Sequence, residues 1–285
     1  MFGCPMLYDP RFQGLSNLNK VGSYWMCMCV SIQSPDFDGL GTLNTIKNGW
    51  MEGCGVLQTP NFIGLKNLYS VGDDWMSKCP MLRNPRFQGL SSLDNVGNKW
   101  MSTCCSLQTP DFVSLGNLRT IKGQWMSQCD VLQTIVFDGL GKLYEVGNYW
   151  MEECPLLRNP RFQGLSSLNR VGCNWMSRCD SIRSPNFDGL GALEKVGNNW
   201  MSECAILWNP VFDGLGNLNR VGNYWMSGCP ILRNPRFQGL SNLNKVGHYW
   251  MYGCRSLQSP DFDGLGNLRT FESDWMEKVG ILQTR

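Results

Sequence analysis

Residues 79–103 read CPMLRNPRFQGLSSLDNVGNKWMST, and Cys104 then opens another copy of the same 25-residue unit. The unit follows the pattern C-x-x-L-x-x-P-x-F-x-G-L-x-x-L-x-x-V-G-x-x-W-M-x-x, and its tryptophan recurs without insertion from Trp25 to Trp275. A fixed period of this kind is typical of solenoids, in which each unit packs against its neighbours. The sequence therefore predicts one elongated solenoid domain over residues 1–285, with eleven repeats and a partial one.

The apolar spacing within the unit predicts its local structure. The segment Leu-x-x-Pro-x-Phe alternates near its end, which favours a short extended strand centred on Phe. The segment Leu-x-x-Leu-x-x-Val-Gly and the four-residue Trp–Cys spacing favour helical turns. Proline precedes the Phe column in every unit except that of Ile135, and proline lacks the N–H of a sheet ladder. We therefore expect about eleven coils with very short parallel strands and helical or irregular return arcs.

The segment Val96–Cys104, Val-Gly-Asn-Lys-Trp-Met-Ser-Thr-Cys, resembles a recurring element of BspA-like leucine-rich repeat proteins. That element reads Ile-Gly-x-x-Ala-Phe-x-x-Cys, so Trp-Met stands here in place of Ala-Phe. The resemblance extends over essentially the whole chain. It implies a leucine-rich-repeat solenoid that binds partners without catalysis, and an exposed or secreted protein engaged in adhesion.

Composition narrows the classes of partner. The net charge is +2 and charged residues make up 17% of the chain, so we expect neither nucleic acid nor an anionic membrane surface as a partner. No apolar run approaches the roughly 18 residues of a membrane span. The opening residues lack the basic and apolar stretches of a secretory signal. Met1 occupies the column of Met26, so we expect the sequence to begin within a repeat, as a fragment of a longer array would.

Eleven of the fourteen cysteines form one column with the repeat spacing, and Cys27, Cys105 and Cys173 stand outside it. Free cysteine is among the most buried residue types, so the column is interpreted as buried thiols. Pairing between neighbouring coils stays an alternative. His248 is the single histidine, and this argues against a zinc array. We expect no metal and no cofactor.

The constant columns are interpreted as core. A tryptophan column could stack bases or sugars, but constant occupancy favours packing of each Trp on its neighbours. Trp208 lies outside the column and is expected to be exposed as a contact residue. Asp36 and Asp38 flank a Phe and are expected to be solvated surface charges. No nucleophile–base pair is evident, so the chain is predicted not to be an enzyme.

The variable position between the Pro and Phe columns is the candidate partner-binding face. We call this position the Pro–Phe row. Its polar members are Arg11, Asp36, Asn61, Arg86, Asp111, Arg161, Asn186, Arg236 and Asp261, with Val136 and Val211 completing it, and Trp208 is added as an exposed aromatic contact. Arginine recurs every third coil, which indicates either a grid for an extended partner or the copying of a 75-residue block.

These observations predict a non-enzymatic protein-interaction or adhesion module that binds a protein or glycan on the outward strand face. The alternative is a structural or surface-coat protein that associates end to end. Near-identical units and apparently uncapped ends favour that alternative. The last unit is irregular, with Phe271-Glu272 in place of Val-Gly and Val279 in place of Cys.

Overall fold

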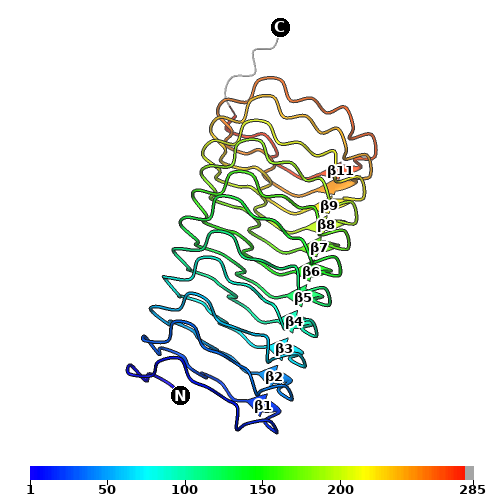
Figure 1. Ribbon diagram of the computed structural model, residues 1–285. Helices are drawn as coiled ribbons and strands as arrows, with labels where there is room; N and C mark the ends of the chain where they lie inside the picture. The colour runs from blue at the N-terminus through cyan, green and yellow to red at the C-terminus, as the bar shows by residue number, and fades with distance from the viewer. Residues whose placement is uncertain (280–285) are drawn as a thin grey trace.

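The computed structural model describes residues 1–279, which form a stack of similar coils with one two-residue strand in each (Figure 1). The strands are β1 (Lys20–Val21), β2 (Thr45–Ile46), β3 (Ser70–Val71), β4 (Asn95–Val96), β5 (Thr120–Ile121), β6 (Glu145–Val146), β7 (Arg170–Val171), β8 (Lys195–Val196), β9 (Arg220–Val221), β10 (Lys245–Val246) and β11 (Thr270–Phe271). The eleven strands agree with the predicted number of coils, and the prediction of a repeat solenoid is confirmed.

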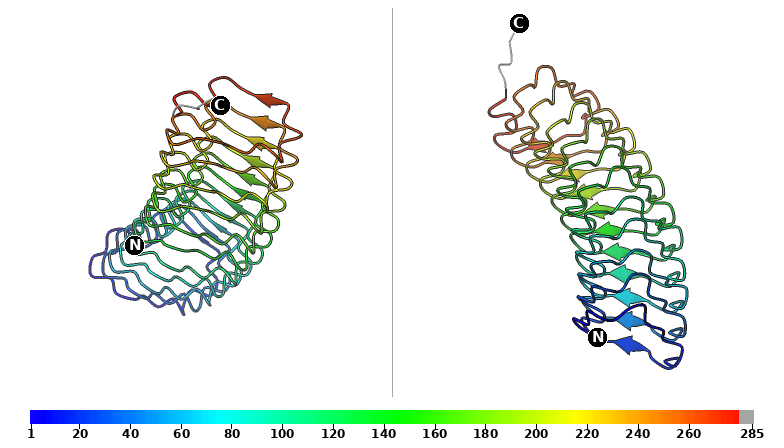
Figure 2. Two further views of the ribbon diagram at one scale, coloured as in Figure 1. Left: turned by 90° about the horizontal axis from the view of Figure 1, so that it is seen from above. Right: turned by 60° about the vertical axis from the view of Figure 1, so that its left-hand side comes forward.

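All eleven strands belong to one parallel sheet in sequence order. Each residue pairs with the residue one repeat later, as Asn95 pairs with Thr120 and Val96 with Ile121. Since every strand between the two ends has a neighbour on both sides, the sheet has no free edge along its length. Figure 2 shows that the stack bends along its axis while the strands stay side by side along one side of it.

The predicted position of the strands was wrong. The continuous ladder runs through the Val/Ile column, whereas the Phe-adjacent position contributes isolated parallel bridges such as Arg86 with Asp111. Proline fits beside the Phe column because the neighbouring coil needs only its carbonyl as a hydrogen-bond acceptor. Asp111 N, for example, donates to Pro85 O at 2.9 Å. The expectation of a low strand content is confirmed.

No helix occurs in residues 1–279, so the helical form of the return arcs is also corrected. The three-residue apolar spacing belongs to consecutive turns instead. Leu90 N donates to Phe87 O at 3.1 Å, and Leu93 N donates to Leu90 O at 3.0 Å. Two such turns place Phe, Leu and Leu at successive inner corners of the coil, which gives the same spacing as a helix face.

The core consists of ladders of identical side chains. Trp75 is fully buried and stacks on Trp50 and Trp100 at ring-centroid distances of 5.2 and 5.1 Å. The Phe rings form a parallel stack, with Phe87 and Phe112 5.7 Å apart and edge-on to the tryptophans. Aromatic pairs favour such offset and edge-to-face contacts. The interpretation of the Trp column as core is confirmed.

The Trp-Met arc has an unusual backbone. The methionine after each column tryptophan from Trp25 to Trp250 has a positive φ, 52° at Met76 and 54° at Met101, a region that residues other than glycine rarely adopt. Contacts between coils hold it there: Met76 N donates to Trp50 O at 3.0 Å, and the Cys104 thiol lies 3.1 Å from Met76 O. The same pair of contacts fixes each methionine of this column from Met51 to Met226 from the coil on either side.

Candidate partner-binding surfaces

The structure places the Pro–Phe row on one line of the molecular surface. Neighbouring members face each other across the isolated bridges, including Asp36 with Asn61 and Arg236 with Asp261. Arg86 and Arg236 are exposed, while Asp36 and Asp261 are half-buried. The row therefore varies in charge and polarity, with arginine at every third position and the apolar Val136 and Val211 between polar members.

Hydrogen bonds order part of this row. Asn61 Nδ2 donates to Asp36 Oδ1 at 3.1 Å, and Asp36 Oδ1 also accepts from Asp38 N at 3.2 Å. Arg86, Arg161 and Arg236, in contrast, have no carboxylate within 4.0 Å among residues 1–279. The carboxylates of the row thus act in local turns, and the guanidinium groups stay available to a partner.

Two shallow grooves lie along the Pro–Phe row. One, of about 470 Å³, is lined by Asn61 and Arg86, and the other, of about 240 Å³, is lined by Arg161 and Asn186. Trp208 lies outside both grooves, is 38% exposed and has the Arg183 guanidinium 5.7 Å from its ring centroid. Its predicted exposure is confirmed, and a role in binding stays a prediction.

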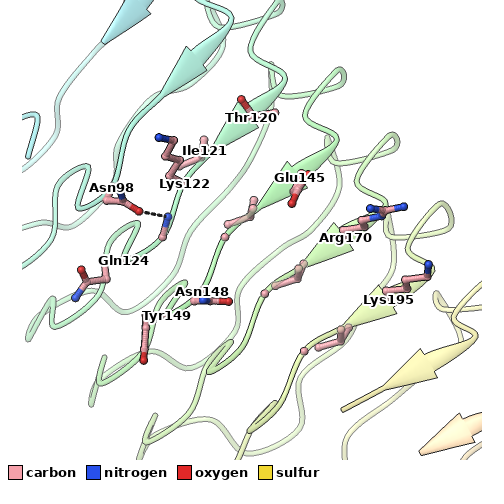
Figure 3. A pocket seen from close by; sticks show the side chains of 17 residues that line it. Asn98, Thr120, Ile121, Lys122, Gln124, Glu145, Asn148, Tyr149, Arg170 and Lys195 are labelled. Atoms are coloured by element: carbon pink, nitrogen blue, oxygen red, sulfur yellow. Dashed lines mark hydrogen bonds between the residues drawn. The ribbon is translucent and has the colours of Figure 1, made fainter. Parts of the chain in front are cut away.

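A second surface, which the sequence reasoning missed, follows the strands themselves. We call the first, outward residue of each strand the strand row. Its members are Lys20, Thr45, Ser70, Asn95, Thr120, Glu145, Arg170, Lys195, Arg220, Lys245 and Thr270. Figure 3 shows Thr120, Glu145, Arg170 and Lys195 following one another from strand to strand. Reading this single column down the repeats would have revealed four consecutive cations, because each is one residue before a constant apolar position.

The strand row borders an open trough. One part, of about 760 Å³, reaches from Asn98 to Gly197, and the next, of about 320 Å³, reaches from Lys195 to Gly247. The two parts share Lys195 and Val196, so they form one continuous depression across β5–β10. The two grooves along the Pro–Phe row have none of their lining residues in common with this trough. The molecule thus presents two separate lateral surfaces.

The cysteine column is buried from Cys29 to Cys254, and Cys4 at its start is half-buried. Burial is the main cause that raises the pKa of the Cys104 and Cys204 thiols to about 12. Cys27, outside the column, has its pKa raised to about 11, first by burial and then by the Glu52 carboxylate. The interpretation of the column as buried thiols is confirmed. In residues 1–279 no three His, Cys, Asp or Glu side chains gather as a metal site would require.

A comparison with solved structures finds matches of low sequence identity. A leucine-rich repeat protein from Bacteroides ovatus is 17% identical over 85% of this chain and 75% of its own, with a TM-score of 0.38. The pneumococcal vaccine antigen PcpA is 10% identical over 98% and 92%, with a TM-score of 0.45. A leucine rich cell surface protein from Faecalibacterium prausnitzii is 12% identical over 90% and 83%, with a TM-score of 0.40.

No curated protein is similar enough in sequence to count as a relative. Among the described residues there is also no helix with the length and apolar character needed to cross a membrane. The sequence profile of the BspA type leucine rich repeat region, in contrast, matches six copies over residues 10–108, 61–183 and 144–275. These matches span nearly the whole stack of coils described above. The chain therefore belongs to the BspA-type leucine-rich repeat family.

Proposed function

We propose that this chain is a non-enzymatic interaction module that binds a protein partner through the Pro–Phe row. A surface or secreted location and a role in adhesion, which the family resemblance implies, are part of the proposal. One observation carries it: the core columns repeat almost unchanged, whereas the exposed Pro–Phe row changes from coil to coil. Such a surface can be specific because its chemistry varies along the rod while its geometry does not.

The chemistry of the row supports a protein as the partner. Arginines that form no ion pair within 4.0 Å among residues 1–279 share the row with half-buried aspartates and with Val136 and Val211. Protein interfaces combine arginine and apolar contacts with a polar rim, and arginine is enriched among residues that dominate binding. Coils stacked about 4.8 Å apart place successive arginines roughly 14 Å from one another, which suits an extended surface better than a small ligand.

The test is binding of the labelled chain to intact cells and to cells from which protease has removed the surface proteins. Replacement of Arg86, Arg161 and Arg236 by Glu should abolish the protease-sensitive part of the binding. A matched control replaces Arg170, Lys195 and Arg220 by Glu, the same number of reversals on the other surface. If the first variant binds like the unaltered chain, the Pro–Phe row is not the interface.

End-to-end association through the terminal coils stays a prediction. Sedimentation of the chain across a range of concentrations tests it. A strictly monomeric particle at every concentration would exclude this alternative.

A further inference from the structure

Four consecutive strands carry a cation at the same outward position. We call Arg170, Lys195, Arg220 and Lys245 the cation ladder; the register pairs each of them directly with the next. Like charges directly opposite each other in a sheet are destabilising. In residues 1–279 only Lys245 of the four has a carboxylate partner, Glu272 at 3.0 Å. The ladder therefore concentrates positive charge that the molecule itself leaves largely uncompensated.

Other charged rows of the same coils do compensate themselves. Arg178 lies between Glu153 and Glu203, and it bonds both, at 3.0 and 3.1 Å. Those three residues occupy one column in consecutive repeats, and their charges alternate. The scaffold thus readily accommodates an alternating row. Four like charges in succession are a departure from this pattern.

Duplication of a single unit does not explain the ladder. The strands are preceded by Leu-Asn in β7, β9 and β10 but by Leu-Glu in β8, and Lys and Arg alternate. Copying of the 75-residue block would make the residues at every third coil equivalent, namely Lys20, Asn95, Arg170 and Lys245. Because Asn95 is neutral, this copying does not by itself produce a cation at the position. The positive charge therefore recurs across units of different sequence.

The trough beside the ladder presents hydrogen-bond donors. Asn148 and Asn223 line the trough; the Asn148 side-chain carbonyl accepts from Cys173 N at 2.8 Å, and that of Asn223 accepts from His248 N at 3.0 Å. Because the carbonyl oxygens are engaged in this way, the amide NH₂ groups remain to face a ligand. Guanidinium, ammonium and amide groups together suit a ligand rich in acceptors, namely carboxylate or sulfate groups and hydroxyls.

Two observations select the class of polyanion. An acidic peptide could not add to this sheet as a strand, since β7–β10 are paired on both sides. Single-stranded nucleic acid binds through runs of aromatic stacking platforms. The lining of the trough has a single aromatic ring, Tyr149, next to β6 and β7, and none between Lys195 and Gly247, so no such run follows the ladder. Contacts from side-chain donors alone are sufficient for an acidic sugar chain that lies along the strand row.

We propose that the cation ladder is a binding site for an anionic polysaccharide, carboxylated or sulfated, which lies across β7–β10. Glu145, the next residue of the strand row, ends the site because it repels the same ligand. This inference rests on the proposed function only in treating the chain as a binding module, and it uses a different surface.

The test measures binding of fluorescently labelled polygalacturonate and heparin fragments to the chain by anisotropy, with dextran as the neutral control and oligo-dT as the nucleic acid control.

The R170Q/K195Q/R220Q/K245Q variant should lower the affinity at least about tenfold, since several charge contacts are lost together. Glu145→Lys, which lengthens the ladder, should raise it. Binding should weaken from about 0.1 M to about 1 M NaCl as the Debye length shortens. Preference for one polysaccharide would distinguish carboxylate from sulfate recognition.

Three outcomes would overturn the proposal: no binding of either acidic polysaccharide, equal binding by the quadruple Gln variant, or tighter binding of oligo-dT. The denaturation midpoint of the quadruple variant verifies its fold, as the four side chains lie outside the core. The R86E/R161E/R236E variant should bind the polysaccharides with an affinity no more than about threefold lower. Loss of polysaccharide binding alone would therefore leave the proposed protein-binding function unaffected. Loss of protein binding alone would likewise leave the polysaccharide site unaffected.

Discussion

The strand row differs sharply between the two halves of the rod. We call Thr45, Ser70, Asn95 and Thr120 of β2–β5 the neutral ladder, and the register that pairs them is the register of the cation ladder. Within the neutral ladder one side-chain hydrogen bond joins two members, as Ser70 Oγ donates to Asn95 Oδ1 at 2.6 Å. The cation ladder has no such internal partners among its own members.

The inner surfaces of the two halves are nearly identical. Trp75 and Trp200 are both fully buried, and their ring-centroid distances to the neighbouring tryptophans are 5.1–5.3 Å. A solenoid therefore separates stability from recognition, because one set of columns packs the core and another meets the solvent. The neutral half serves as an internal reference for the cationic half.

The largest expected effect tests whether the cores are equivalent. Trp75→Ala and Trp200→Ala should each lower the free energy of unfolding by about 3–5 kcal/mol, since each leaves a ring-sized cavity between two coils. Urea denaturation followed by circular dichroism measures both. Values that differ by more than about 1 kcal/mol would show that the halves differ inside as well as outside.

Alkaline pH gives a second test of equivalence. The pKa of the Cys104 and Cys204 thiols is raised to about 12 in the folded chain, against a usual value of 9.0. Between these values the unfolded chain loses its thiol protons first, so stability is complete below pH 9 and falls as the pH rises toward 12. The slope is about 1.4 kcal/mol per pH unit for each thiol.

Cys104→Ala and Cys204→Ala should therefore flatten the alkaline stability curve by the same amount. Urea midpoints at several pH values, taken with a reducing agent present, supply the comparison. A change in one variant and not in the other would contradict the equivalence of the halves.

Relief of charge repulsion should have a smaller effect. The R170T/K195T/R220T variant should raise the free energy of unfolding by about 1 kcal/mol at low salt. The reason is that each pair of like charges directly opposite each other in the sheet destabilises it by about 0.2–1 kcal/mol. Urea titrations at low and high salt measure it, and the gain should shrink as salt screens the charges. The mirror variant S70K/N95K/T120K should be destabilised under the same conditions. No change in either variant would contradict repulsion along the ladder.

The smallest effect comes from one single substitution in each ladder. Ser70→Ala removes the hydrogen bond from a half-buried hydroxyl to Asn95 and should cost about 0.5 kcal/mol. Lys195→Ala, at the same position in the cationic half, should have the opposite sign because it removes a repelling charge. Differential unfolding of the two variants in urea is the measurement. The same sign for both would mean that the ladders do not differ as described.

The period and the core columns could be predicted because a constant apolar residue at a constant spacing has few explanations besides packing. The position of the strands could not. Leu90 and Leu93 lie at the corners of successive turns, and turns closed every three residues imitate the spacing of a helix. The left-handed backbone at Met76 had no local signal either, since contacts from neighbouring coils impose it.

The candidate surfaces, too, include one feature that the sequence predicted and one that it did not. The exposure of Trp208 followed from its position outside every constant column. The cation ladder was missed because its residues are ordinary within each repeat, and only the parallel register of β7–β10 brings them together. Sequence reasoning along one unit sees neighbours in the chain, whereas this surface is built from neighbours one repeat apart.

The uniform stacking of the coils also bears on how such a chain can evolve. A recombination event that adds or removes a whole 25-residue unit leaves every Trp, Phe and Cys ladder in register. An insertion or deletion of one residue would put the ladders out of register at that junction. Copy number is therefore a variable that the genome can alter without disturbing the fold. The length of an exposed row, and with it the number of contacts offered to a long ligand, can change in single steps.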